Sequence, residues 1–173
     1  MAFGVLAYPN LKRYDYNFIQ EFRKENDELY FFVAEPHFAF VFPISNIDKM
    51  QFIEEVFDKA KGFLPFDFEI KCATVNKDSF IDYFHLLLVP DKGYSNIVKL
   101  HDNLYSGLFL KELRLDIDFI PHMGIANSKD KFKVKEWADS WNKKDFSIEG
   151  TIDKLTVIEY TNNILTDLSE IKL

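Results

Sequence analysis

Hydrophobic positions along the chain switch between helical and strand spacing, which predicts an α+β fold. Apolar residues recur every three or four positions in residues 15–28, 47–61, 95–108 and 128–144, which predicts four helices. Alternating or continuous short apolar runs predict strands at residues 2–9, 30–42, 66–70, 83–89, 119–126, 146–151, 155–161 and 164–173. The apolar stripe of the last helix includes Trp137 and Trp141, which we expect in the core.

Polar residues and glycines beside these runs predict where the elements begin and end. We expect Ser45 or Asn46 to cap the second helix and Gly62 to end it. Ser128 is the expected cap of the fourth helix, and Asn162-Asn163 predicts a tight turn between the last two strands.

Two of the predicted strands contain a histidine that directly follows a proline. The segments are Pro36-His37-Phe38-Ala39-Phe40 and Pro121-His122-Met123-Gly124-Ile125. Because side chains alternate across a strand, His37, Ala39 and Val41 are expected on one face, and Phe38, Phe40 and Phe42 on the core face. The same rule places His122, Gly124 and Ala126 together. If the two strands lie side by side, small residues line a groove with an imidazole on each flank, a geometry suited to paired acid and base chemistry.

The same order of elements occurs twice along the chain. In both halves, a strand with a motif histidine is followed by a helix and then by a strand of similar sequence. The two histidines are 85 residues apart (122 minus 37). This spacing is too long for a solenoid repeat, which is about 20–50 residues. We therefore expect residues 1–173 to form a single domain of two duplicated, pseudo-symmetric lobes of antiparallel sheet, with helices outside and a histidine cleft between the lobes.

Composition and charge narrow the classes of function. Hydrophobic residues make up 47% of the chain and 19 residues are Phe, enough for a well-packed core. The net charge of −7 argues against binding of long nucleic acid through its phosphates. The single cysteine, Cys72, excludes an internal disulfide and a zinc cluster. No apolar run is long enough to span a membrane, so we expect no membrane partner and a cytoplasmic location.

The two histidine motifs resemble those of the 2H phosphoesterase superfamily, also called RNA ligase-like or 2′,3′-cyclic phosphodiesterases. Members carry two motifs of the form His, hydrophobic, Thr or Ser, hydrophobic, one in each lobe. The resemblance implies that one of His37 and His122 acts as general base and the other as general acid, with no cofactor and no metal. A histidine pKa near 6.5 would make one neutral and one protonated imidazole available near neutral pH, with a bell-shaped pH profile.

The chain departs from the family pattern at the two phosphate-holding hydroxyls, where it has Ala39 and Gly124. These substrate-binding positions therefore lack side-chain donors, and the loss of two donors aimed at a phosphoryl oxygen would cost several orders of magnitude in rate. A backbone N–H, a lysine, an ordered water or a tyrosine such as Tyr160 would have to replace them.

The other two histidines favour structural roles. His101 lies on the apolar stripe of a predicted helix and His85 in an apolar strand, and we expect both to be hydrogen-bonded within the core.

Two functions follow for the motif histidines. One is hydrolysis of a 2′,3′-cyclic phosphate or a related phosphodiester of a small nucleotide or RNA end. The other is an inactive 2H module that binds a nucleotide, an RNA end or another small phosphorylated ligand.

Overall fold

The computed structural model describes all residues from Met1 to Leu173 and confirms an α+β fold. The strands are β1 (Ala2–Ala7), β2 (Asn10–Leu11), β3 (Phe38–Ile44), β4 (Phe66–Lys77), β5 (Phe84–Lys92), β6 (Met123–Ser128), β7 (Ile148–Ile152), β8 (Lys154–Thr161) and β9 (Ile164–Lys172). The helices are α1 (Arg13–Asn26), α2 (Lys49–Ala60), α3 (Tyr94–Leu104) and α4 (Lys131–Asn142), and the short 3-10 helix η1 spans Gly107–Glu112. None of the helices combines the length and the apolar character that crossing a bilayer requires.

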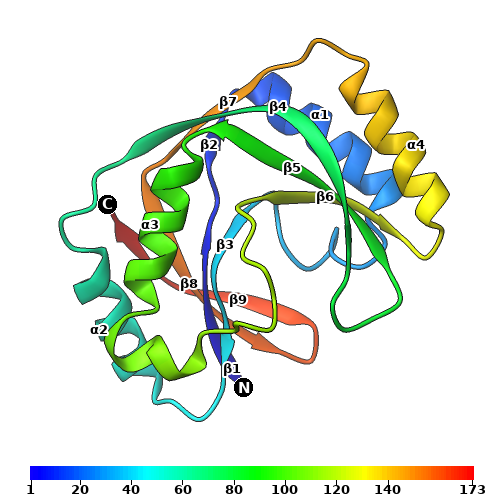
Figure 1. The fold of residues 1–173 in the computed structure, drawn as a ribbon. Coiled ribbons are helices and arrows are strands. Elements are labelled where there is room, and N and C mark those ends of the chain that lie inside the picture. The colour runs from blue at the N-terminus through cyan, green and yellow to red at the C-terminus, as the bar shows by residue number, and fades with distance from the viewer.

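The strands form two antiparallel sheets, shown in Figure 1. The four-stranded sheet has the order β3-β1-β8-β9, and the five-stranded sheet has the order β2-β7-β4-β5-β6. In each sheet, the strand that follows a motif histidine lies at an edge: β3 in the first and β6 in the second. The edge position leaves one side of each histidine strand free of a neighbouring strand.

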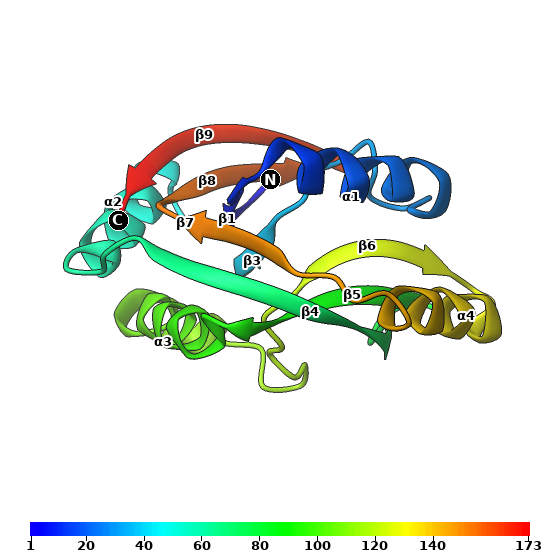
Figure 2. The ribbon, with the colours of Figure 1, turned by 90° about the horizontal axis from the view of Figure 1, so that it is seen from above.

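Two pairs of helices cover the sheets at opposite ends of the molecule. Figures 1 and 2 show α2 and α3 on one side and α1 and α4 on the other. Phe3 of β1 packs on Phe52 of α2 with ring centroids 5.7 Å apart. Phe38 of β3 packs on Phe68 of β4 at 5.1 Å, so the core is continuous between the two sheets. Trp141 is buried as expected.

Both helix caps predicted from serine or asparagine were wrong. Asp48 caps α2, where its carboxylate accepts hydrogen bonds from the N–H groups of Met50 and Gln51 at 2.9 and 3.1 Å. Asp130 caps α4 in the same way. Each aspartate directly precedes its helix and can reach the free N–H groups of the first turn. The predicted turns are confirmed, because Gly62, Asn162 and Asn163 all have positive φ.

The histidine strands begin later than the hydrophobic pattern predicts. β3 starts at Phe38 and β6 at Met123, each directly after its histidine. A proline lacks the N–H that a strand ladder needs, so Pro36 and Pro121 keep the preceding residues out of the sheet. Both histidines therefore lie directly before the first residue of an edge strand, where the backbone enters the sheet.

A register shift occurs at the same place in both strands. In β3, Ala39 pairs with Leu6 and Val41 pairs with Val5, so Phe40 is an extra residue. In β6, Gly124 pairs with Leu87 and Ala126 pairs with Leu86, so Ile125 is extra. Each extra residue is the third after its histidine, and such shifts turn the strand locally.

Because of the register shifts, the predicted alternation of side chains was wrong for the residues that follow each shift. Val41 was expected beside His37 but is buried in the core, while Phe42 was expected in the core and is 36% exposed. Ala126 is likewise a core residue. One extra residue reverses the faces of the residues that follow it, which in β3 lasts until a second register shift between Val41 and Ile44. The motif residues themselves keep the predicted order, with Phe38 and Met123 buried and Gly124 exposed.

Candidate active site

The two motif histidines are held by the same local hydrogen bond. Nδ1 of His37 lies 2.7 Å from the carbonyl oxygen of Glu35, and Nδ1 of His122 lies 2.6 Å from the carbonyl oxygen of Ile120. A carbonyl oxygen only accepts, so Nδ1 of both rings carries the proton. In the neutral rings, Nε2 then has a free lone pair, and neither Nε2 has a partner in the protein.

Burial lowers the pKa of both histidines. The pKa of His37 falls to about 4, first because of burial and further because of the positive charges of Arg23 and His122, while the hydrogen bond to Glu35 opposes the shift. Burial also lowers the pKa of His122, with a further decrease from the charge of His85. The influence of His122 on His37 places the two imidazoles within electrostatic reach of each other. Both rings are therefore neutral at pH 7 in the free protein.

The positions of the two missing hydroxyls are open. Ala39 is half-buried and Gly124 is exposed. A Cβ built on Gly124 would have no neighbouring atom within 4 Å, and its backbone φ is not in the left-handed region. The structure therefore has room for a side chain where the family motif carries a donor.

Tyr8 is the aromatic residue beside His37, and the sequence pattern did not identify it. Ala7 pairs with Phe38 across β1 and β3, so Tyr8 comes opposite His37. The two rings are in edge contact, with centroids 6.1 Å apart at 71°. The Tyr8 hydroxyl donates to Asp167 at 3.5 Å, and burial and the nearby Asp167 carboxylate raise the Tyr8 pKa. The Tyr8 side chain is thus uncharged, and its ring forms one side of the candidate site next to His37.

Tyr160, one of the residues considered as a replacement for the missing hydroxyls, lies away from the two motif histidines. It pairs with Ala2, at the opposite end of β1 from Tyr8, and its hydroxyl donates to Asn163 at 2.6 Å. Strands rise about 3.3 Å per residue, so the six steps from Ala2 to Tyr8 correspond to about 20 Å. Tyr160 does not replace a donor at the histidine pair.

A buried charged network supports the segment that leads to His37. Arg23 of α1 is 1% exposed and forms an ion pair with Asp27 at 2.9 Å. Its guanidinium also donates to the carbonyl oxygens of Ala34 and Tyr30 at 2.8 and 3.2 Å. Because a buried guanidinium needs all its donors satisfied, these bonds fix the course of the loop that ends at His37.

His85 and His101 are both hydrogen-bonded, as predicted, but only His101 is buried in the core. His85 of β5 contacts Asp78 through Nε2 at 2.9 Å and stacks against Tyr30, with centroids 6.1 Å apart. His101 is buried, and its Nδ1 lies 2.9 Å from a carboxylate oxygen of Asp102. The charge of His85 lowers the pKa of His122, so His85 is within electrostatic reach of the candidate site.

Comparison with known proteins identifies the family. A family model described as the 2′-5′ RNA ligase superfamily matches residues 12–164. A comparison with curated protein sequences gives no match. Among solved structures, TT0787 of Thermus thermophilus is 12% identical, with a TM-score of 0.64 over 100% of this chain and 98% of that one.

Two further structures share the fold. E. coli LigT complexed with 3′-AMP is 12% identical, with a TM-score of 0.58 over 99% of this chain and 97% of that one. Usb1 of Kluyveromyces marxianus is 5% identical, with a TM-score of 0.56 over 99% and 98%. The family match spans most of the chain and agrees with two antiparallel sheets, each with one edge strand that follows a motif histidine. The chain belongs to the 2′-5′ RNA ligase superfamily, the 2H phosphoesterases.

Proposed function

We propose that this protein is a metal-independent phosphoesterase that opens a 2′,3′-cyclic phosphate, or a related phosphodiester, on a small nucleotide or an RNA end. The observation that carries the proposal is the matched anchoring of His37 and His122 through Nδ1. This anchoring leaves two Nε2 atoms for the substrate, one from each edge strand. The bound nucleotides in two structures of E. coli LigT, 3′-AMP and ATP, support a nucleotide as ligand.

In the proposed reaction, one imidazole is neutral and the other is protonated. Nε2 of the neutral ring takes a proton from water as the water oxygen bonds to phosphorus. The bond between phosphorus and one ribose oxygen breaks, and Nε2–H of the other ring protonates that oxygen. Each turnover consumes one water and interchanges the protonation states of the two rings, so a proton exchange with solvent restores the starting state.

The substrate itself helps to supply the protonated ring. Burial keeps both histidines neutral in the free protein at pH 7. A phosphodiester placed between the two rings brings a negative charge, which raises the pKa of a neighbouring imidazole. We therefore expect the acid to be protonated mainly in the complex with substrate.

A second candidate function rests on Ala39 and Gly124. Without their hydroxyls, the transition state lacks two side-chain donors, and electrostatic stabilisation of this kind is often the largest contribution to catalysis. A module that binds a nucleotide, an RNA end or another small phosphorylated ligand without turnover needs the two Nε2 atoms but not the missing hydroxyls.

One experiment separates the two functions. A panel of 2′,3′-cyclic nucleotides and short RNAs with cyclic phosphate ends is incubated with the protein in EDTA over pH 4–9. Turnover in the wild type that is lost in both His37→Ala and His122→Ala supports the phosphoesterase. Ligand binding without turnover, weakened by either substitution, supports the binding module. Thermal melting of each variant shows whether the loss comes from unfolding.

A further inference from the structure

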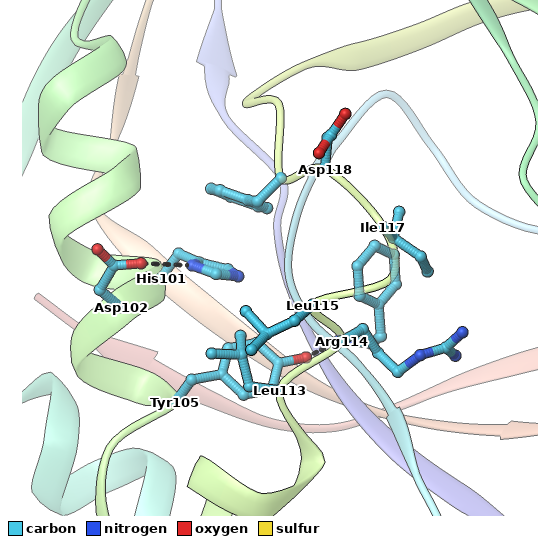
Figure 3. A pocket seen from close by; sticks show the side chains of 10 residues that line it. His101, Asp102, Tyr105, Leu113, Arg114, Leu115, Ile117 and Asp118 are labelled. Carbon is cyan, nitrogen blue, oxygen red and sulfur yellow. Dashed lines mark hydrogen bonds and ion pairs between the residues drawn. The ribbon is translucent and has the colours of Figure 1, made fainter.

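A pocket of about 260 Å³ lies between α3 and the segment that leads to His122 (Figure 3). Neither His37 nor His122 lines this pocket, so it is distinct from the candidate active site. Its walls are mostly apolar and include Phe42, Tyr105, Leu113, Leu115 and Phe119. Drug-sized ligands occupy pockets of about 300–1,000 Å³, so this volume suits a smaller group.

His101 presents a polar atom to this pocket that no protein group satisfies. Its side chain is 6% exposed, and its Nδ1 is bonded to Asp102. Figure 3 shows the second ring nitrogen directed away from Asp102 and into the pocket. Because the Asp102 carboxylate accepts from Nδ1–H, Nε2 of the neutral ring is an acceptor. Burial lowers the pKa of His101 and keeps the ring neutral at pH 7.

Stacking alone does not account for a histidine at position 101. The ring stacks on Phe119, with centroids 3.5 Å apart at 13°, and a phenylalanine at position 101 would stack equally well. Nε2 of His101 makes no hydrogen bond within the protein and is not fully buried, so a molecule in the pocket can reach it. A ligand in the pocket can therefore donate a hydrogen bond to Nε2, an interaction that a phenylalanine would not offer.

Two walls of the pocket lie on the segments that contain the motif histidines. Phe119 precedes His122 by three residues, which span at most about 10 Å of extended chain. Phe42 lies on β3, five residues after His37, and its N–H donates to the Tyr105 hydroxyl at 2.9 Å. Both pocket walls therefore belong to the chain segments that carry the two histidines.

The charges around the pocket favour a neutral ring over a phosphate. Asp102 and Asp118 contribute two carboxylates to the lining. Arg114 also lines the pocket, but its guanidinium is engaged by Asp116 through bonds of 2.8 and 2.6 Å. A second phosphate would meet the two carboxylates, whereas a flat ring stacks on the aromatic walls without a charge penalty.

We propose that this pocket binds the nucleobase of the substrate, with Nε2 of His101 accepting a hydrogen bond from an amino group of the base. The inference rests on the proposed function, because the base is placed here by a phosphate held at His37 and His122. It assigns a base-binding role to His101 and predicts a preference for bases that carry an exocyclic amino group, such as adenine or cytosine.

The first test measures binding without phosphate chemistry. Calorimetry compares adenosine with purine riboside, which lacks the amino group, on the wild type, His101→Phe and His101→Gln. One neutral hydrogen bond corresponds to about a two- to tenfold difference in affinity, so adenosine should bind that much more tightly to the wild type. His101→Phe should abolish the difference, while His101→Gln, which keeps a polar atom near the Nε2 position, should retain part of it. Equal binding of both nucleosides to the wild type, or no binding of either, would overturn the proposal.

The second test separates the base pocket from the proposed function. The ratio kcat/KM is compared for 2′,3′-cyclic AMP and for glycerol 1,2-cyclic phosphate, which has no base. We expect His101→Phe to lower only the value for cyclic AMP, by about two- to tenfold. An equal decrease for both substrates would mean that His101 acts through the Phe119 segment and would overturn the base assignment. Nucleoside binding that depends on His101 in a protein without turnover would keep the pocket and overturn the phosphoesterase.

Discussion

Nδ2 of Asn127, on β6, donates to a carboxylate oxygen of Asp27, just after α1, over a distance of 2.5 Å. Asn127 belongs to the strand that follows His122, and Asp27 is the ion-pair partner of Arg23. Asn127 also accepts from the N–H of Leu29 at 3.3 Å. The loop before one histidine is thus fastened to the strand that follows the other, which fixes the spacing of the proposed acid and base.

The first prediction concerns this buried network. Asp27→Asn removes the negative charge beside Arg23, which is 1% exposed, and should lower the free energy of unfolding by about 3–5 kcal/mol. Chemical denaturation measures the change. The matched control is Asp58→Asn, because Asp58 pairs with Lys61 at an exposed position and should cost less than about 1 kcal/mol. Similar losses in both variants would contradict a special role for the network.

A second prediction uses the space at Gly124. Gly124→Ser introduces a hydroxyl where a Cβ meets no atom within 4 Å, so the fold should tolerate it. If the missing donor limits the rate, kcat should rise by about tenfold or more, since a single transition-state donor is commonly worth about 10²–10³. Gly124→Ala is the control for the added Cβ. An equal change in both variants would show that the hydroxyl is not responsible.

The third prediction is an acidic pH optimum. Both histidines have lowered pKa values, about 4 for His37, so the protonated acid is scarce at pH 7. The proposed mechanism needs one protonated ring, and kcat/KM should therefore rise as the pH falls from 7 and reach its maximum between about pH 4 and 6.5. A maximum above pH 7 in a pH–rate profile would contradict the proposed protonation states.

Tyr8 provides a related prediction for the same profile. Its ring contacts His37 and contributes to the burial that lowers the His37 pKa. Tyr8→Ala should let water reach the imidazole and move this pKa upward toward 6.5, which NMR titration of the ring would detect. Tyr8→Phe keeps the ring and should leave the pKa nearly unchanged. A shift of the same size in Tyr8→Phe would assign the effect to the hydroxyl and its Asp167 partner instead.

The fifth prediction links His37 to stability. Its pKa is about 4 in the folded protein, whereas the usual value of 6.5 applies after unfolding, so between these values the unfolded chain binds more protons. Stability should therefore fall as the pH falls from 6.5 to 4, by at most about 1.4 kcal/mol per pH unit for this group. Denaturation of His37→Gln over this range should show a shallower slope. Identical slopes would place the titration elsewhere.

Hydrophobic periodicity was sufficient to predict the four helices and most of the strands. The two histidine motifs could be read directly from the sequence. The sequence also contained a signal that the prediction did not use: Arg23 lies four residues after Ile19 and so shares the buried face of α1, and Asp27 follows at the same spacing just after the helix. Tyr8 could not be placed beside His37 because that contact depends on which strands pair. The register shifts at Phe40 and Ile125 were also missed, because an extra residue in one strand is defined only by its partner.

The internal duplication stays a prediction, but the matching features around the histidines agree with it. Each motif has its proline one residue before the histidine, its backbone acceptor two residues before and its register shift three residues after. The roles of His37, His122, Ala39 and Gly124 also remain proposals, to be tested by the substitutions above.

The arrangement of the four-stranded sheet has a consequence for how the chain folds. β1 lies between β3 and β8, so residues near 5 pair both with residues near 41 and with residues near 157. Contacts between such distant parts of a chain close large loops and slow folding. During synthesis, β1 has an unpaired side until residues 154–161 have left the ribosome. We therefore expect slow refolding and a late-forming first sheet, which makes the nascent chain a substrate for chaperones.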